Sequence, residues 1–157
     1  MKPFKPEHYY RAALERMRQA QILYRQDSCF TLAMYVAGVA IECLLRAFKG
    51  RRDPSFDEKH DLLRLFKASG ILRKSTGESY DLADPTPRLL LKWINEIVVL
   101  WSNDYRFASE ERLRSHLRKN VAFRRITKGD LLKASARQLI EACQKFMDRG
   151  VFLWQKS

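Results

Sequence analysis

Glycine and proline are scarce in this chain of 157 residues, which contains six glycines and five prolines. Collagen-like chains and low-complexity disordered chains are much richer in both residues, so the composition excludes these two classes. The chain also lacks a convincing run in which apolar and polar residues alternate, the pattern of a half-buried β-strand. Because 46% of the residues are hydrophobic, the chain can bury a core of its own, and we expect one globular domain over residues 1–157.

Cysteine and histidine are equally sparse, with three of each. No two cysteines form a CxxC pair, and each lies inside an apolar helical pattern: Cys29, Cys43 and Cys143. We therefore expect the buried thiols of a cytoplasmic protein and no disulfide. The histidines are scattered, without an HxxxH pattern or a cysteine partner, so the sequence predicts no metal site and no cofactor.

Marks of export and membrane insertion are absent as well. The first ten residues, MKPFKPEHYY, contain no apolar stretch of the kind found in secretory signals. The most apolar segment, CFTLAMYVAGVAIECLL, is short for a membrane span and carries Glu42. We therefore expect a core helix here and a protein that does not associate with membranes.

Apolar residues recur with the period of an α-helix along most of the chain. Pro6 suits a first helical turn. The apolar stripe after it consists of Tyr10, Ala13, Leu14, Met17, Ala20 and Tyr24. A second helix, apolar almost all round, is expected from about residue 29 to residue 48, capped by Asp27 and Ser28. Because only two or three residues separate them, the two helices should form an antiparallel hairpin, with the second at the centre of the core.

Four further helices complete the predicted fold. The segment DEKHDLLRLFKASG should be helical up to Gly70, and another helix should run from about residue 87 to residue 103. A short helix is expected over SEERLRSHLRKN with Ser109 as its cap, followed by a long one over TKGDLLKASARQLIEACQKFMDRGVFLW. A polar loop at about residues 73–87 lies within the domain. The sequence thus predicts an all-α, up-and-down bundle of about five to six helices.

The charge is one-sided: 30 lysines and arginines stand against 18 aspartates and glutamates, a net charge of +12. This excess favours an acidic partner such as RNA, nucleotide phosphates or an anionic surface; the alternative is a basic protein without such a partner. Half of the excess lies in residues 105–128, which contain two glutamates and eight basic residues: Arg106, Arg112, Arg114, Arg118, Lys119, Arg124, Arg125 and Lys128. In this segment, Phe107 and Phe123 either stack on bases or anchor the short helix to the core.

Three segments of the chain resemble elements of the HEPN family, and the likeness runs from about residue 7 to residue 150. YRAALERMRQAQILYRQDSCFTLAMYVAGVAIECLLRAF resembles the opening helical hairpin of that family, in which a helix rich in small residues carries the element A-x-E-x-x-L-K/R-A, here AIECLLRA. KHDLLRLFKASGI is similar to the H-D/N-L-x-x-L helix that follows, and LWSNDYRF to a tryptophan and an arginine–aromatic pair near the end of the fourth helix.

The resemblance implies a helical bundle, often dimeric, that is associated with RNA or nucleotides in prokaryotic toxin–antitoxin or defence systems. Many members are metal-independent endoribonucleases, in which an arginine, about four to six intervening residues and a histidine make up the motif, and these residues converge on one phosphate across a dimer. Others accompany a nucleotidyltransferase-type partner protein and have no nuclease role. A homodimer is also favoured by three tryptophans, more large apolar surface than a small bundle easily covers: Trp93, Trp101 and Trp154.

The strict nuclease spacing is absent from this chain. Nine residues separate Arg106, the position that the resemblance selects, from His116, and three separate Arg112 from His116. One hypothesis is therefore a non-catalytic module that binds RNA or a nucleotide-bearing partner. The other is an endoribonuclease with a divergent site formed by Arg106, Arg112 and His116, since arginine can neutralise a phosphorane and histidine can transfer protons. The expected nucleic-acid contacts are Arg106, Arg114, Arg118, Lys119, Arg124 and Arg125.

Glu42 is the acidic residue that most needs a partner, because an unpaired carboxylate is costly in an apolar environment. The resemblance places Arg106 on a neighbouring helix end, so we expect either a structural ion pair between the two or a polar pocket where Arg106 meets a phosphate. His60 opens the third helix beside Asp61, and we expect a helix-cap contact from it rather than catalysis. His8 should be exposed at the start of the first helix.

Overall fold

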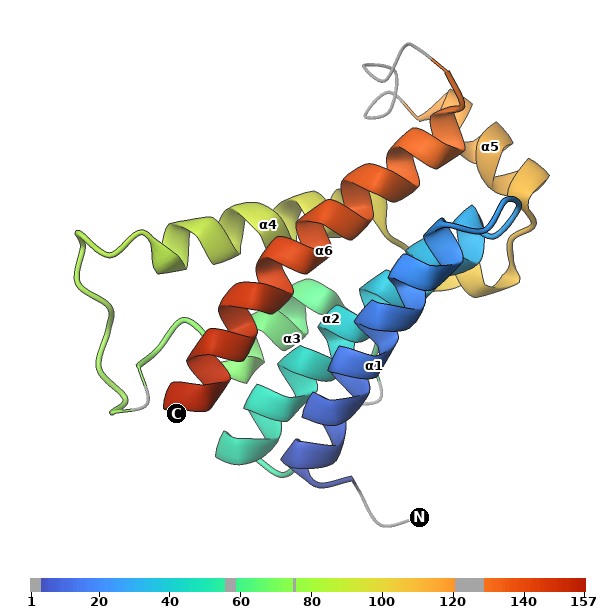
Figure 1. Ribbon diagram of the computed structural model, residues 1–157. Helices are drawn as coiled ribbons and strands as arrows, with labels where there is room; N and C mark the ends of the chain where they lie inside the picture. The colour runs from blue at the N-terminus through green and yellow to red at the C-terminus, as the bar shows by residue number, and fades with distance from the viewer. Residues whose placement is uncertain (1–3, 56–58, 75, 121–128) are drawn as a thin grey trace.

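Helices are the main regular elements in the part of the chain that the computed structural model describes, residues 4–55, 59–74, 76–120 and 129–157. In chain order they are α1 (Pro6–Tyr24), α2 (Phe30–Arg52), α3 (Leu62–Ser69), α4 (Thr86–Leu100), the 3-10 helix η1 (Asn103–Phe107), α5 (Glu110–Lys119) and α6 (Leu131–Lys156) (Figure 1). The same ranges contain no β-strand, only an isolated bridge between Arg73 and Ser79. The prediction of an all-α helical bundle is confirmed.

The predicted hairpin is present, with α1 and α2 side by side and joined by residues 25–29 (Figure 1). Its predicted cap is wrong: α2 begins after Cys29, whose side chain makes no capping hydrogen bond, and Ser28 takes a left-handed φ of 64°. The N–H of Thr31 instead donates to a carboxylate oxygen of Glu110 at 2.7 Å. This bond occupies an open donor of the first helical turn and places negative charge at the positive end of the helix.

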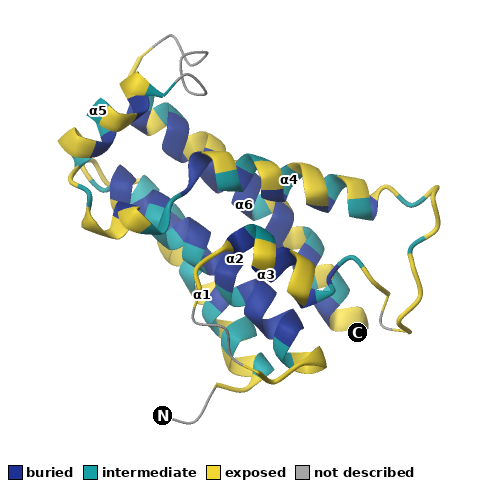
Figure 2. Cartoon of the chain, turned by 180° about the vertical axis from the view of Figure 1, so that it is seen from behind, coloured by how far each residue is buried: buried dark blue, intermediate teal, exposed yellow. Residues whose placement is uncertain are grey.

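Helix α2 lies at the centre of the bundle, in contact with α1, α3, α5, α6 and η1, and it is buried along most of its length (Figure 2). By length and composition this helix would also suit a membrane span. However, 72% of its most apolar 18-residue window is buried inside the bundle. Helix α2 is therefore a core helix, as predicted, and no membrane protein is indicated.

Small residues on α2 allow other elements to approach closely. Trp101, which directly follows α4, packs across Gly38, where an added Cβ atom would overlap the indole ring. The indole Nε1–H donates to the carbonyl oxygen of Tyr35 at 3.2 Å. Because Trp101 has extended backbone angles, α4 ends at Leu100, three residues before the predicted end at residue 103, and the chain passes at once into η1.

The predicted ends of α3 and the predicted buried face of α1 agree only in part with the structure. Helix α3 ends as predicted at Gly70, whose φ of 65° is the left-handed conformation of a helix stop. Its start differs, since residues 59–61 are not helical and the first helical residue is Leu62. Within the first apolar stripe, Leu14 is 41% exposed, so the buried face of α1 is narrower than predicted.

The tryptophan argument for a homodimer is wrong. Trp101 and Trp154 are only 8% and 7% exposed, and Trp93 packs partly buried against the core. The Trp154 ring stacks on Tyr10 at 4.9 Å between centroids. A single bundle therefore covers the large side chains that suggested an interface, and the homodimer stays a prediction that rests on the resemblance.

Candidate functional site

The described part of the segment with the expected site residues folds as η1 followed by α5. The Ser109 hydroxyl accepts from the N–H of Arg112 at 3.1 Å, so Ser109 caps α5 as predicted. Leu113 and Leu117 bury the inner face of α5 against the bundle. Arg112 and His116 each precede one of these leucines, so they lie on an adjacent face of the helix, where both are exposed.

Arg112 and His116 line the same depression, of about 340 Å³, between η1 and α5. Tyr105 and Leu113 form its buried wall. Two of the three predicted catalytic residues thus come together, on positions four apart on one helix face. The third, Arg106, is not part of the lining. It lies at the surface, with its guanidinium 4.5 Å from the ring centre of Phe107.

Phe107 is the most exposed aromatic residue among the large hydrophobic side chains of the described chain, at 77%. Because the ring is exposed, it does not anchor the short helix to the core, so that alternative is wrong for this residue. Tyr105 takes that role instead, since it is buried. Burial raises the pKa of its phenol to about 12, which keeps Tyr105 neutral and unsuited to act as a base near neutral pH. Phe123 lies outside the described residues.

The predicted phosphate contacts divide into three groups. Arg114 is engaged by carboxylates, at 3.0 Å from Asp130 and 3.9 Å from Glu110, and thereby ties α5 to the start of α6. Arg118 and Lys119 are exposed in the last turn of α5. Two further predicted contacts lie outside the described residues: Arg124 and Arg125.

The partner predicted for Glu42 is wrong. Glu42 is 6% exposed, and its carboxylate accepts from Nε of Arg46 at 2.9 Å, with a terminal nitrogen of Arg46 at the same distance. Arg46 lies one turn further along α2 and therefore shares the face of Glu42. It is itself 7% exposed and also donates to the carbonyl oxygen of Lys59 at 3.2 Å. Arg106 lies at the surface of η1, away from this pair.

His60 is the second partner of Glu42 and was not predicted as one. Its Nδ1 lies 3.0 Å from each carboxylate oxygen. The expected cap contact belongs to Asp61, which accepts from the N–H of Arg64 at 3.0 Å. The only sequence signal for His60 was its place in the H-D-L element. A carboxylate on one ring nitrogen fixes the imidazole tautomer and leaves the other nitrogen for a ligand.

The exposed part of His60 faces a depression of about 280 Å³, lined also by Ser102 and Asp104. The same two residues line the depression that holds Arg112 and His116. The two depressions therefore adjoin along η1. In this way the fold brings two histidines and an arginine, from α5 and the approach to α3, to neighbouring hollows on one side of the molecule.

The described residues offer little for metal binding or for thiol chemistry. No group of three histidine, cysteine, aspartate or glutamate side chains suits a metal ion within the described residues. The three cysteines are free. Burial raises the pKa of Cys143 and raises that of Cys43 to about 11, so neither thiol is an activated nucleophile.

Comparisons with known proteins gave no relative: no family model, no curated protein and no solved structure matches this chain.

Proposed function

We propose that the protein is an HEPN-like helical module that binds RNA, free or as part of a nucleotide-bearing partner, through η1 and α5. In line with the resemblance, the setting is a prokaryotic toxin–antitoxin or defence system in the cytoplasm, with a homodimer as the working unit and a nucleotidyltransferase-type protein as a possible associate. The observation that carries the proposal is the exposed ring of Phe107, which lies beside Arg106 and lines the same hollow as Arg112.

An exposed aromatic ring flanked by arginines suits single-stranded RNA. Bases stack on such a ring, with about 1–3 kcal/mol lost per base when the ring is removed. The cations hold the phosphates, and each contact releases a condensed counterion. Three phosphate contacts correspond to a slope of about −2 in log K against log salt for a single strand.

Two matched triple variants test the proposal. One is Arg106→Glu/Arg112→Glu/Arg118→Glu on the proposed surface. The other reverses three exposed arginines, Arg11 and Arg18 on α1 and Arg25 directly after it, and so changes the net charge equally.

Binding of a short fluorescent single-stranded RNA is followed by anisotropy at several salt concentrations. The surface variant should lose most of the affinity and most of the salt slope, and Phe107→Ala should weaken binding without changing the slope. Equal losses in both triple variants, with helical circular dichroism intact, would show diffuse charge attraction and reject a defined site.

The second candidate function is a metal-independent endoribonuclease, and the pair of His60 with Glu42 favours it. Cleavage without a metal needs a base for the 2′-hydroxyl, an acid for the leaving oxygen and a cation for the phosphorane. His60 and His116 could carry out the two proton transfers, and Arg112 could stabilise the negative charge of the phosphorane.

This second candidate predicts RNA cleavage in EDTA. His60→Gln and His116→Ala should each lower the rate by about 10²–10⁴-fold, whereas the exposed His8→Ala should not. If the wild-type protein binds RNA but leaves it intact in EDTA, the nuclease is rejected and the binding module stands.

A further inference from the structure

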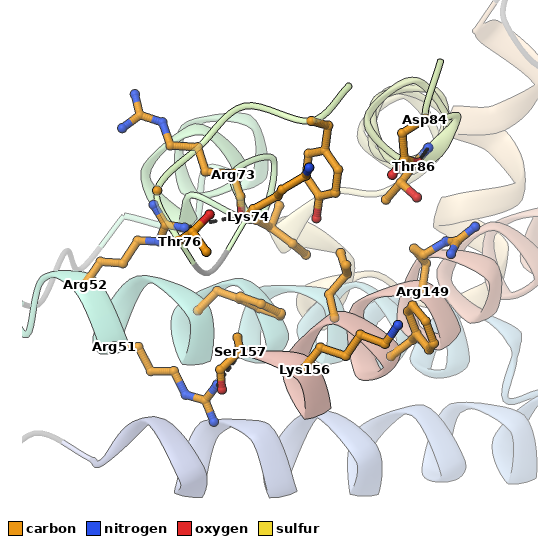
Figure 3. A pocket seen from close by; sticks show the side chains of 16 residues that line it. Arg51, Arg52, Arg73, Lys74, Thr76, Asp84, Thr86, Arg149, Lys156 and Ser157 are labelled. Atoms are coloured by element: carbon orange, nitrogen blue, oxygen red, sulfur yellow. Dashed lines mark hydrogen bonds between the residues drawn. The ribbon is translucent and has the colours of Figure 1, made fainter. Parts of the chain in front are cut away.

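Basic side chains converge on a second site at the other end of the bundle, a cleft of about 730 Å³ (Figure 3). The C-terminal ends of α2 and α6 form two of its walls, and the loop between α3 and α4 forms the third. The cleft lies at the C-terminal end of α6, whereas α5 packs near the N-terminal end of the same helix (Figure 1). The basic residues in the lining are Arg51, Arg52, Arg73, Lys74, Arg149 and Lys156.

The positive charge in this cleft is hardly compensated. Among the described residues, none of the six cations forms an ion pair with an aspartate or glutamate side chain. Asp84 is the one carboxylate side chain in the lining. It accepts from the N–H of Thr86 at 2.8 Å, a bond that holds its pKa below the usual range. The six lining cations thus outnumber the one carboxylate side chain, which is already occupied at the start of α4.

Two of the arginines build the walls. The guanidinium of Arg51 lies 3.1 Å from the ring centre of Trp154 and donates to the carbonyl oxygen of that residue at 3.3 Å. Arg52 reaches across Gly70 and donates to the carbonyl oxygen of Arg73 at 3.4 Å. A Cβ atom at Gly70 would meet the Arg52 guanidinium at 2.5 Å, so the glycine leaves room for this crossing.

No cation of the lining has a carboxylate side chain as partner among the described residues, although Lys156 and Arg149 lie over the Phe152 ring, at 4.0 and 5.8 Å from its centre. Figure 3 shows Arg52 and Lys74 on one side of the cleft and Arg149 and Lys156 on the other. Since like charges in one concave site repel each other, the unliganded cleft destabilises the fold. A multiply charged anion between the two sides would remove that repulsion and bind to both at once.

We propose that this cleft binds a compact polyphosphate group, either free or carried by a nucleoside. Its volume lies within the range of small-molecule sites, about 300–1,000 Å³, and cations on three walls suit several phosphates held close together. A single-stranded RNA would instead call for an open groove with aromatic rings along it. Tyr80 and Phe152 also line the cleft and could contact a nucleoside ring.

The test is isothermal titration of the full chain with inorganic tripolyphosphate, in wild type and in Lys74→Ala/Arg149→Ala. A matched control is Arg11→Ala/Arg18→Ala on α1, which removes the same charge from exposed positions outside the cleft. Wild type should show saturable binding at one site. The cleft variant should bind at least about tenfold more weakly, because two charge-assisted contacts are lost, while the control should match wild type.

A second arm uses a nucleoside triphosphate. If it binds more tightly than tripolyphosphate and the difference disappears in Tyr80→Ala/Phe152→Ala, a nucleoside carries the group; equal affinities identify the free polyphosphate. Unsaturable binding, or equal losses in the cleft variant and the control, would overturn the proposal. The RNA site is independent, since Arg106→Glu/Arg112→Glu/Arg118→Glu should leave tripolyphosphate binding intact.

Discussion

The buried ion pair of Glu42 and Arg46 offers a demanding test of the fold, through the variant Glu42→Ala. The substitution removes the carboxylate that both Arg46 and His60 contact. Because the Arg46 side chain is 8% exposed, its guanidinium cannot regain full hydration. Removing one partner of a buried pair costs about 3–5 kcal/mol, because the other charge stays buried and loses the carboxylate that balanced it. That is a large part of the total stability of a domain, about 5–15 kcal/mol.

The melting temperature should fall in proportion. For a chain of this size, about 2–4 °C is lost per kcal/mol, so Glu42→Ala should melt about 6–20 °C below wild type. Urea unfolding followed by circular dichroism gives the free energy of unfolding directly.

The double variant Glu42→Met/Arg46→Met serves as the control. It removes both charges together, so most of the lost stability should return. A remaining deficit of about 1 kcal/mol is expected from the lost bond between Arg46 and the carbonyl oxygen of Lys59. A cost below about 1 kcal/mol for Glu42→Ala, or a double variant less stable than the single one, would refute the reasoning.

Three further predictions concern other contacts. Asp130 caps α6 and pairs with Arg114, which lowers the pKa of the Asp130 carboxyl in the folded protein. The stabilisation from this carboxylate is present above its pKa in the unfolded chain and is lost as the pH falls through its pKa in the folded protein. Asp130→Ala should therefore cost about 1–2 kcal/mol at pH 7 and much less at pH 2, as measured by urea titrations. Gly38→Ala should displace the Trp101 ring and cost about 1–3 kcal/mol, with a shift in tryptophan fluorescence. Cys43, with a pKa of about 11, should be about 0.1% thiolate at pH 8 and label slowly with iodoacetamide.

Each of these predictions has an outcome that contradicts it. An Asp130→Ala cost that is the same at both pH values would exclude the carboxylate as its source. Unchanged fluorescence and stability in Gly38→Ala would show that the indole does not pack on that glycine. Labelling of Cys43 in the folded protein as fast as in urea would contradict its partial burial.

The order of the helices could be predicted because it depends on local patterns. Apolar residues recur at the helical period, Gly70 ends α3 and Ser109 caps α5, and each of these signals lies within a few residues of the structure that it specifies. The cap of α2 could not be predicted in this way. The carboxylate at its N-terminus comes from Glu110, 79 positions further along the chain.

The partners of Glu42 were missed for a related reason. An arginine four positions along a helix is usually a solvated surface residue, and only the burial of α2 on nearly all sides makes Arg46 an internal partner. The basic cleft was harder still to predict from local sequence patterns. Arg52, Lys74 and Arg149 belong to different elements and meet only after α6 packs against α2.

The central claim is that RNA binds at η1 and α5, and photo-crosslinking tests it most directly. Single-stranded RNA that contains 4-thiouridine is bound to the full chain and irradiated, and the crosslinked peptides are identified by mass spectrometry. We expect crosslinks within residues 103–119, centred on Phe107, and their loss in Phe107→Ala while the helical circular dichroism is retained. Crosslinks scattered over α1 and α6, or confined to the cleft beside Lys74, would contradict the claim.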